Sequence, residues 1–140
     1  MTNRFVLDTD ILTLYQQGQA AVARNVQAHP LDKLAVTIIS VEQQLTGWYT
    51  KLRRAKKPDQ MARAYKRMTD AVRFLVRFEL LTFSEPAIHQ YDSLRATHRR
   101  LDKSDLRIAA IVLDQNGTLV TANVRDFQQI PGLILEDWSK

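Results

Sequence analysis

The segment that decides the fold lies at the start of the chain and reads Arg4-Phe5-Val6-Leu7-Asp8-Thr9-Asp10-Ile11-Leu12. Its first four residues predict a short buried strand, because they form an apolar run that ends at a pair of carboxylates. The apolar residues between Ile11 and Tyr15 then predict a helical turn. Asp8 is therefore expected immediately after a strand and in front of a helix.

The rest of the chain repeats this alternation of short apolar strands and helices. Ser40, Ser84 and Ser104 are predicted to cap helices at their N-termini, and Gln43 lies at the capping-box position after Ser40. The alternation predicts an α/β fold in which a central, mainly parallel sheet of four to five strands is flanked by helices, in a single domain over residues 1–140. Further strands are predicted at 34–39, 80–83, 118–121 and 133–135, and helices at 20–28, 40–54, 59–79, 84–98 and 105–114.

The composition limits the classes of protein to which the chain can belong. Cysteine is absent, which excludes a disulfide framework, a thiolate zinc site and a cysteine nucleophile, and favours a reducing cytoplasm. No apolar run approaches the roughly 20 residues that span a bilayer, so no membrane association is expected. The formal charge of +5 favours a polyanionic partner. The basic clusters at 51–57, 63–67 and 95–103 are either solvated helix faces or part of a phosphate-binding surface.

Five polar side chains follow strands or open helices at one predicted edge of the sheet, where sites form in parallel α/β sheets. Asp8 follows the first strand, Glu42 lies in the first turn after the second, and Asp105 opens a buried helix. Asn123 and Asp126 follow the fourth strand. Because carboxylates gathered without partners repel one another, their convergence predicts a bound cation. Oxygen ligands without cysteine favour Mg²⁺ or Mn²⁺ over Zn²⁺.

Each of these residues also has an ordinary structural explanation. Asp8 would serve as a helix N-cap, while Glu42 and Asp105 would offset the positive end of a helix. Asp10 is expected to cap the first helix and Asp102 to pair with Arg99 or Lys103. The joint placement of the acids is what predicts a site. Three aromatic residues either stack on nucleic-acid bases or pack in the core or at a partner interface, namely Trp48, Tyr49 and Tyr65.

Four motifs resemble, in order, those of PIN-domain toxins of the VapC family. They are Phe5–Leu12, Asp105–Ala110, Leu119–Phe127 and Glu136–Trp138, and together they cover nearly the whole chain. The resemblance implies a Mg²⁺-dependent endoribonuclease that is the toxin of a type II toxin–antitoxin system. It further implies an RNA substrate, a VapB-like antitoxin and a homodimer.

The resemblance also assigns roles to the site residues. It implies that Asp8 and Asp105 are the primary metal ligands, and that Asn123 and Asp126 orient the attacking water or a second ion. Alignment on Gly47 and Ser40 puts Gln43 in the usual acidic position of the family, with Glu42 one residue away. One helical step rotates a side chain by about 100°. Either Glu42 is the third ligand through a local shift, or the metal site is weakened; our prediction is Glu42.

Two other functions stay open at this stage. A degenerate PIN domain or basic RNA-binding module would bind RNA without cutting it, and Gln43 in the acidic position supports this reading. A phosphatase of the haloacid-dehalogenase type would use an Asp-Thr-Asp motif after a strand, as at Asp8 to Asp10. That family also needs a downstream Gly-Asp motif, which the chain lacks.

Overall fold

A five-stranded parallel sheet forms the centre of the protein in the computed structural model, which describes residues 3–140. The strand order is β3-β2-β1-β4-β5, and every neighbouring pair is parallel. The predicted α/β class with a parallel sheet is therefore confirmed, with five strands. The strands are β1 (Phe5–Leu7), β2 (Leu34–Thr37), β3 (Glu79–Leu81), β4 (Thr118–Val120) and β5 (Ile134–Glu136).

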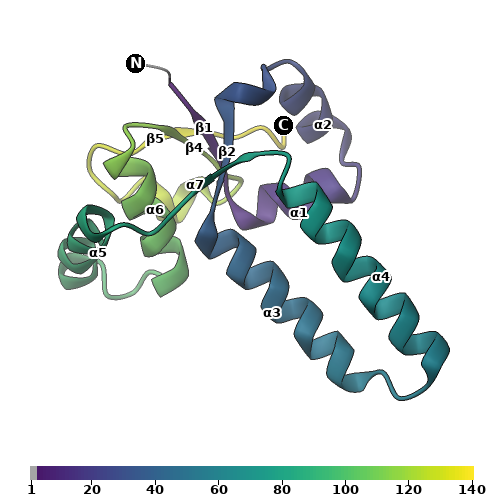
Figure 1. The fold of residues 1–140 in the computed structure, drawn as a ribbon. Coiled ribbons are helices and arrows are strands. Elements are labelled where there is room, and N and C mark those ends of the chain that lie inside the picture. The colour runs from purple at the N-terminus through teal and green to yellow at the C-terminus, as the bar shows by residue number, and fades with distance from the viewer. Residues whose placement is uncertain (1–2) are drawn as a thin grey trace.

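Helices cover both faces of the sheet, and two of them extend beyond it (Figure 1). The helices are α1 (Thr9–Gln16), α2 (Ala20–Gln27), α3 (Ile38–Arg54), α4 (Pro58–Leu75), α5 (Glu85–Thr97), α6 (Lys103–Asp114) and α7 (Val124–Phe127), with a 3₁₀ turn at Leu31–Lys33. In Figure 1 the antiparallel pair α3 and α4 projects away from the sheet as a hairpin. Among the described residues no helix is both long and apolar enough to cross a membrane.

Alternate residues of the three central strands, β1, β2 and β4, supply two separate cores, as the pleat of a sheet requires. Val6 packs with α5, α6 and α7 on one face. Its neighbour Leu7 packs with α1, α2 and the end of α4 on the other face. Both side chains are fully buried. Because both faces are covered, the carboxyl-terminal edge of the sheet is where polar groups gather.

Two helices begin earlier than the sequence predicts. Thr37, not Ser40, caps α3, because the pairing of β2 with β3 ends at Thr37 and its hydroxyl then accepts from the Ser40 backbone N–H. Asp102, not Ser104, caps α6, because its carboxylate accepts from two backbone N–H groups of the first turn. In addition α4 ends at Leu75, before the turn that leads into β3. The prediction of an ion pair for Asp102 is replaced by this capping role.

Candidate active site

Asp8 lies at the centre of the site because the sheet register holds it there. Leu7 pairs with Val120 across β1 and β4, and the Asp8 backbone N–H donates to the Val120 carbonyl at 3.0 Å. The Asp8 carboxylate caps α1 by accepting from the Ile11 N–H at 2.8 Å. The role of helix N-cap expected for Asp8 from the sequence is therefore confirmed. Only 5% of Asp8 is exposed. A charged group this deep must be stabilised by its surroundings.

The environment of Asp8 disfavours its charged form. Burial is the largest cause and raises the pKa of Asp8 to about 6 from its ordinary value of 3.8, and the nearby charges of Asp10 and Asp105 act in the same direction. Hydrogen bonds from the Thr121 side chain and the Ile11 backbone only partly offset this rise. Burial and like-charge repulsion at one carboxylate are typical of a site that binds a cation or moves a proton.

Asp105 comes to the same place from α6. It is the third residue of that helix, which is anchored by buried side chains at Leu106 and from Ile108 to Val112. Burial, the largest cause, and the charges of Asp102, Asp10 and Asp126 together raise the pKa of Asp105 to about 6. Asp8 and Asp105, from opposite ends of the sequence, therefore repel each other. The two residues therefore lie near each other, as the sequence predicts.

The segment after β4 completes one side of the site. The Asn123 side-chain amide donates to the Asp126 carboxylate at 3.1 Å, and the Asn123 backbone N–H donates to the Thr121 hydroxyl oxygen at 2.9 Å. Thr121 in turn bonds to Asp8. The buried ring of Phe127 anchors the short helix that carries Asp126. Asn123 and Asp126 are thus held next to the two central carboxylates.

Gln43, not Glu42, contacts the segment that follows β1. The Thr9 hydroxyl bonds to the Ser40 hydroxyl at 2.9 Å and donates to the Gln43 side-chain carbonyl. Ser40 and Gln43 are three residues apart and share one face of α3. Glu42 is exposed and is not among the charges that act on Asp8 or Asp105. The structure therefore brings together four of the five predicted site residues and leaves Glu42 at the periphery.

Comparison with known proteins finds similarity to VapC ribonucleases, over about half of the chain in one case and over nearly all of it in another. No family model matches the sequence. The ribonuclease VapC2 of Rickettsia felis is 39% identical over 71 residues, a match that spans 48% of this chain and 53% of that protein. The ribonuclease VapC1 of Haemophilus influenzae strain R2866 is 28% identical over 140 residues, which cover 97% of this chain and 98% of the relative.

Solved structures extend the similarity to three dimensions. The VapBC2 complex of Rickettsia felis bound to a DNA fragment from its promoter contains a chain with a TM-score of 0.72 and 27% identity. That match covers 96% of this chain and 98% of the solved one. The resemblance to VapC-type PIN-domain ribonucleases is confirmed. The fold described above is accordingly a PIN-like fold.

In this VapC-like chain the acids lack cationic partners. Within residues 3–140, the ion pairs involve other acids, and none involves Asp8, Asp10, Asp105 or Asp126. In the same residues no three acidic or histidine side chains lie close enough to enclose a metal by themselves. Mg²⁺ does not need such a cage, since it usually keeps several waters and binds through one or two carboxylates plus substrate phosphates. The donor set of the VapC-like site fits this mode of binding.

Two contributors to the VapC-like site were missed by sequence reasoning. Thr121, fully buried at the end of β4, bonds to Asp8 and to the Asn123 backbone. Asp10, predicted as a helix cap, lies instead in the first turn of α1 and adds its charge to both central carboxylates. A signal for Asp10 was present in the sequence, because it lies two residues after Asp8 at the end of the first strand.

Proposed function

We propose that the chain is a Mg²⁺-dependent endoribonuclease that acts as the toxin of a type II toxin–antitoxin system. The observation that carries the proposal is the pair of buried, mutually repelling carboxylates, Asp8 and Asp105, in a chain similar to VapC ribonucleases. A bound cation would stabilise the charged form of such a pair. The absence of cysteine agrees with a cytoplasmic location, which remains a prediction.

Asp8 and Asp105 would hold the metal directly, and the exposed Glu42 would contribute through water. Bound there, Mg²⁺ would lower the pKa of water and offset negative charge on the scissile phosphate. Mn²⁺ offers the same chemistry with the same oxygen ligands. Because the pKa values of Asp8 and Asp105 are about 6, both carboxylates are mainly ionised at neutral pH. We therefore expect cleavage to rise as the pH increases through about 6.

Neighbouring side chains would orient the attacking water. Asn123 donates one amide hydrogen to Asp126, which fixes the direction of both groups. Thr121 holds the Asp8 carboxylate and the backbone of Asn123 in one arrangement. Asp126 is then available to accept a hydrogen bond from water beside the metal ligands. Attack by water on the phosphate would leave a 5′-phosphate and a 3′-hydroxyl, whereas a 2′,3′-cyclic phosphate product would exclude this mechanism.

The test is cleavage of end-labelled cellular RNA by the purified chain free of antitoxin. Reactions contain Mg²⁺ or EDTA, and the Asp105→Asn variant is run beside the wild type. Discrete cuts that require Mg²⁺ and disappear in the variant support the proposal. RNA binding without cutting in every reaction favours a degenerate PIN domain, a second candidate that Gln43 in the acidic position supports.

The proposed partners are a VapB-like antitoxin and a second copy of the chain. Support for the antitoxin comes from the solved Rickettsia felis relative, which is a VapBC2 complex. Co-expression with the neighbouring open reading frame should yield a co-purifying protein that suppresses cleavage. Light scattering of the free chain should give twice the mass of 16.1 kDa if the homodimer forms. Failure to recover a partner from the co-expressing cells would remove the support for the antitoxin.

A further inference from the structure

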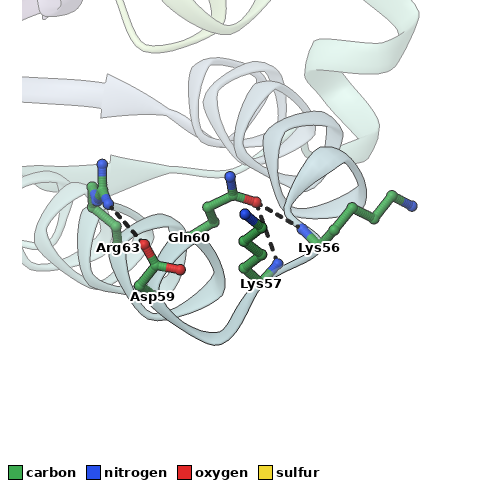
Figure 2. Close-up of polar contacts among 5 residues, drawn as sticks. All are labelled: Lys56, Lys57, Asp59, Gln60 and Arg63. Carbon is green, nitrogen blue, oxygen red and sulfur yellow. Dashed lines mark hydrogen bonds and ion pairs between the residues drawn. The ribbon is translucent and has the colours of Figure 1, made fainter.

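The hairpin of α3 and α4 has a fixed tip. At the turn, the Gln60 side-chain carbonyl accepts from the Lys56 backbone N–H at 3.1 Å and from the Lys57 backbone N–H at 3.3 Å (Figure 2). Asp59 pairs with Arg63 one helical turn away at 3.5 Å. The Gln60 bonds hold the link between the two helices against the start of α4, and the ion pair lies within the first turns of α4. The two helices therefore present a defined surface beyond the sheet.

A groove runs along this surface from Thr9, the residue after Asp8, toward the tip. A cavity of about 610 Å³ begins at Thr9, next to Asp8, and continues past Gln43 and Gly47 to Trp48. A second cavity of about 330 Å³ extends from Trp48 to Arg54 and Arg63. Trp48 and Arg67 line both cavities, so the two form one path. Along α3, Gln43 and Trp48 are five residues apart, which corresponds to about 7.5 Å.

The groove is strongly basic beyond Trp48. Residues 51–67 contain eight lysines and arginines and one acid, so their formal charge of +7 exceeds the +5 of the whole chain. Lys51, Arg54 and Arg67 line the groove, and in the described part of the chain none of them forms an ion pair. Unpaired cations lining a groove are suited to binding the phosphates of a nucleic-acid strand.

Gly47 leaves the floor of the groove open. A Cβ atom at this position would meet nothing within 4 Å, so packing inside the chain does not require glycine there. Glycine in the interior of a helix is unfavourable relative to alanine. A glycine that internal contacts do not explain is consistent with the close approach of a ligand to the helix backbone. It lies directly beside Trp48 in the sequence and in the groove.

Trp48 combines an aromatic face with an adjacent charge. The Lys51 ammonium lies over one face of the Trp48 ring, 4.4 Å from its centre, which orients the ring and leaves the opposite face for stacking on a base. We propose that Trp48 stacks on a base of single-stranded RNA while Lys51, Arg54 and Arg67 bind the flanking phosphates. The groove reaches Thr9, which follows Asp8 in the sequence, so a strand bound in it would continue from there toward the carboxylates. This inference rests on the proposed ribonuclease function and assigns a base-binding position to it.

The first experiment measures binding without cleavage, in EDTA. The chain has two tryptophans, and the other, Trp138, is only 3% exposed and stacks on His29. In a Trp138→Phe variant the tryptophan emission therefore comes from Trp48 alone. We expect a short single-stranded RNA to quench this emission. Heparin, which supplies negative charge without bases, should bind without comparable quenching.

Variants then test the same position by anisotropy of a labelled RNA. Trp48→Ala should weaken binding by roughly 5- to 150-fold, the range for loss of one base–aromatic stack. The matched control Trp48→Phe keeps an aromatic face and should retain most of the affinity. Gly47→Ala should raise the thermal midpoint of the protein yet weaken RNA binding. Lys51→Gln should reduce the slope of log affinity against log salt by about one.

Three results would overturn the proposal. The first is unchanged RNA affinity in Trp48→Ala, and the second is equal quenching by heparin and RNA. The third is that Trp48→Ala and Gly47→Ala abolish binding of the co-expressed antitoxin while RNA binding is unchanged, which assigns the groove to a protein. Cleavage is scored separately in Mg²⁺. RNA that quenches Trp48 but is never cut would refute the nuclease and leave the binding position intact.

Discussion

Replacement of Asp8 by asparagine removes a buried charge and keeps the helix cap, because asparagine caps helices as well as aspartate does. The rise in the pKa of Asp8 from 3.8 to about 6 corresponds to about 3 kcal/mol of unfolding free energy. A raised carboxyl pKa means that the folded state loses its proton less readily than the unfolded state. The charge therefore destabilises the metal-free protein as the pH rises from about 4 to 6, and fully above that range.

Asp8→Asn should consequently be more stable than the wild type at neutral pH without metal, by up to about 3 kcal/mol or roughly 10 °C in midpoint. The gain should fall to roughly half at about pH 5 and become small at about pH 4. Thermal unfolding in EDTA at several pH values measures it. The same variant should lose RNA cleavage and the stabilisation that Mg²⁺ gives the wild type.

Two variants separate the charge from other effects. Asp8→Ala removes both the charge and the cap, so it should be less stable than Asp8→Asn by about 1 kcal/mol. Asp32→Asn removes an exposed charge from the 3₁₀ turn and should leave the midpoint nearly unchanged. If Asp8→Asn is less stable than the wild type at neutral pH, or if its gain does not depend on pH, the buried charge of Asp8 is not destabilising and the argument for a cation at this site fails.

Three further predictions concern the ligands and their support. Asp105→Asn should lower Mg²⁺-dependent cleavage by more than about 100-fold. Loss of a group that only supports a metal ligand costs at most about 100-fold. The control Asp114→Asn, at the far end of the same helix, should cut RNA normally. Gln43→Glu should tighten Mg²⁺ binding about tenfold by calorimetry, since a charge about 6 Å from a divalent ion in water-like surroundings contributes about 1.4 kcal/mol. Glu42→Gln should change the Mg²⁺ affinity by less than this. A larger loss of affinity would identify Glu42 as a direct ligand. Phe127→Ala should lower the free energy of unfolding, measured in urea, by about 3–5 kcal/mol. A urea curve that matches the wild type would contradict the anchoring role of this buried ring.

The sequence predicts those parts of the site that depend on the ends of strands. Asp8 and Asn123 could be placed because apolar β-branched runs mark where β1 and β4 end, and parallel strands end at one edge. Asp105 could be placed because the apolar residues that follow it indicate a buried helix. In each case a local pattern and the general geometry of parallel sheets are sufficient.

Which side chains of α3 reach the site depends on how the whole chain folds. Ile38 and Ile39 favour a strand by residue type, but they lie in the helix because strand pairing ends at Thr37. Which face of α3 meets Thr9 then depends on how the helix packs against the segment after β1. That packing puts Ser40 and Gln43 beside Thr9 and leaves Glu42 exposed. No spacing rule in the sequence alone distinguishes Glu42 from Gln43.

The carboxylate site and the groove carry charges of opposite sign. The hairpin residues 51–67 carry +7, so the remainder of the chain carries a net −2, with three further acids, Asp10, Asp102 and Asp126, near Asp8 or Asp105. A phosphate that reaches these acids without a cation would be repelled, whereas the same phosphate is attracted along the groove by Lys51 and Arg67. If Mg²⁺ binds here as we propose, it removes the repulsion, and a phosphate held at the site adds ligands for the ion. Since coupling between two ligands is reciprocal, RNA and Mg²⁺ must each strengthen the binding of the other by the same factor.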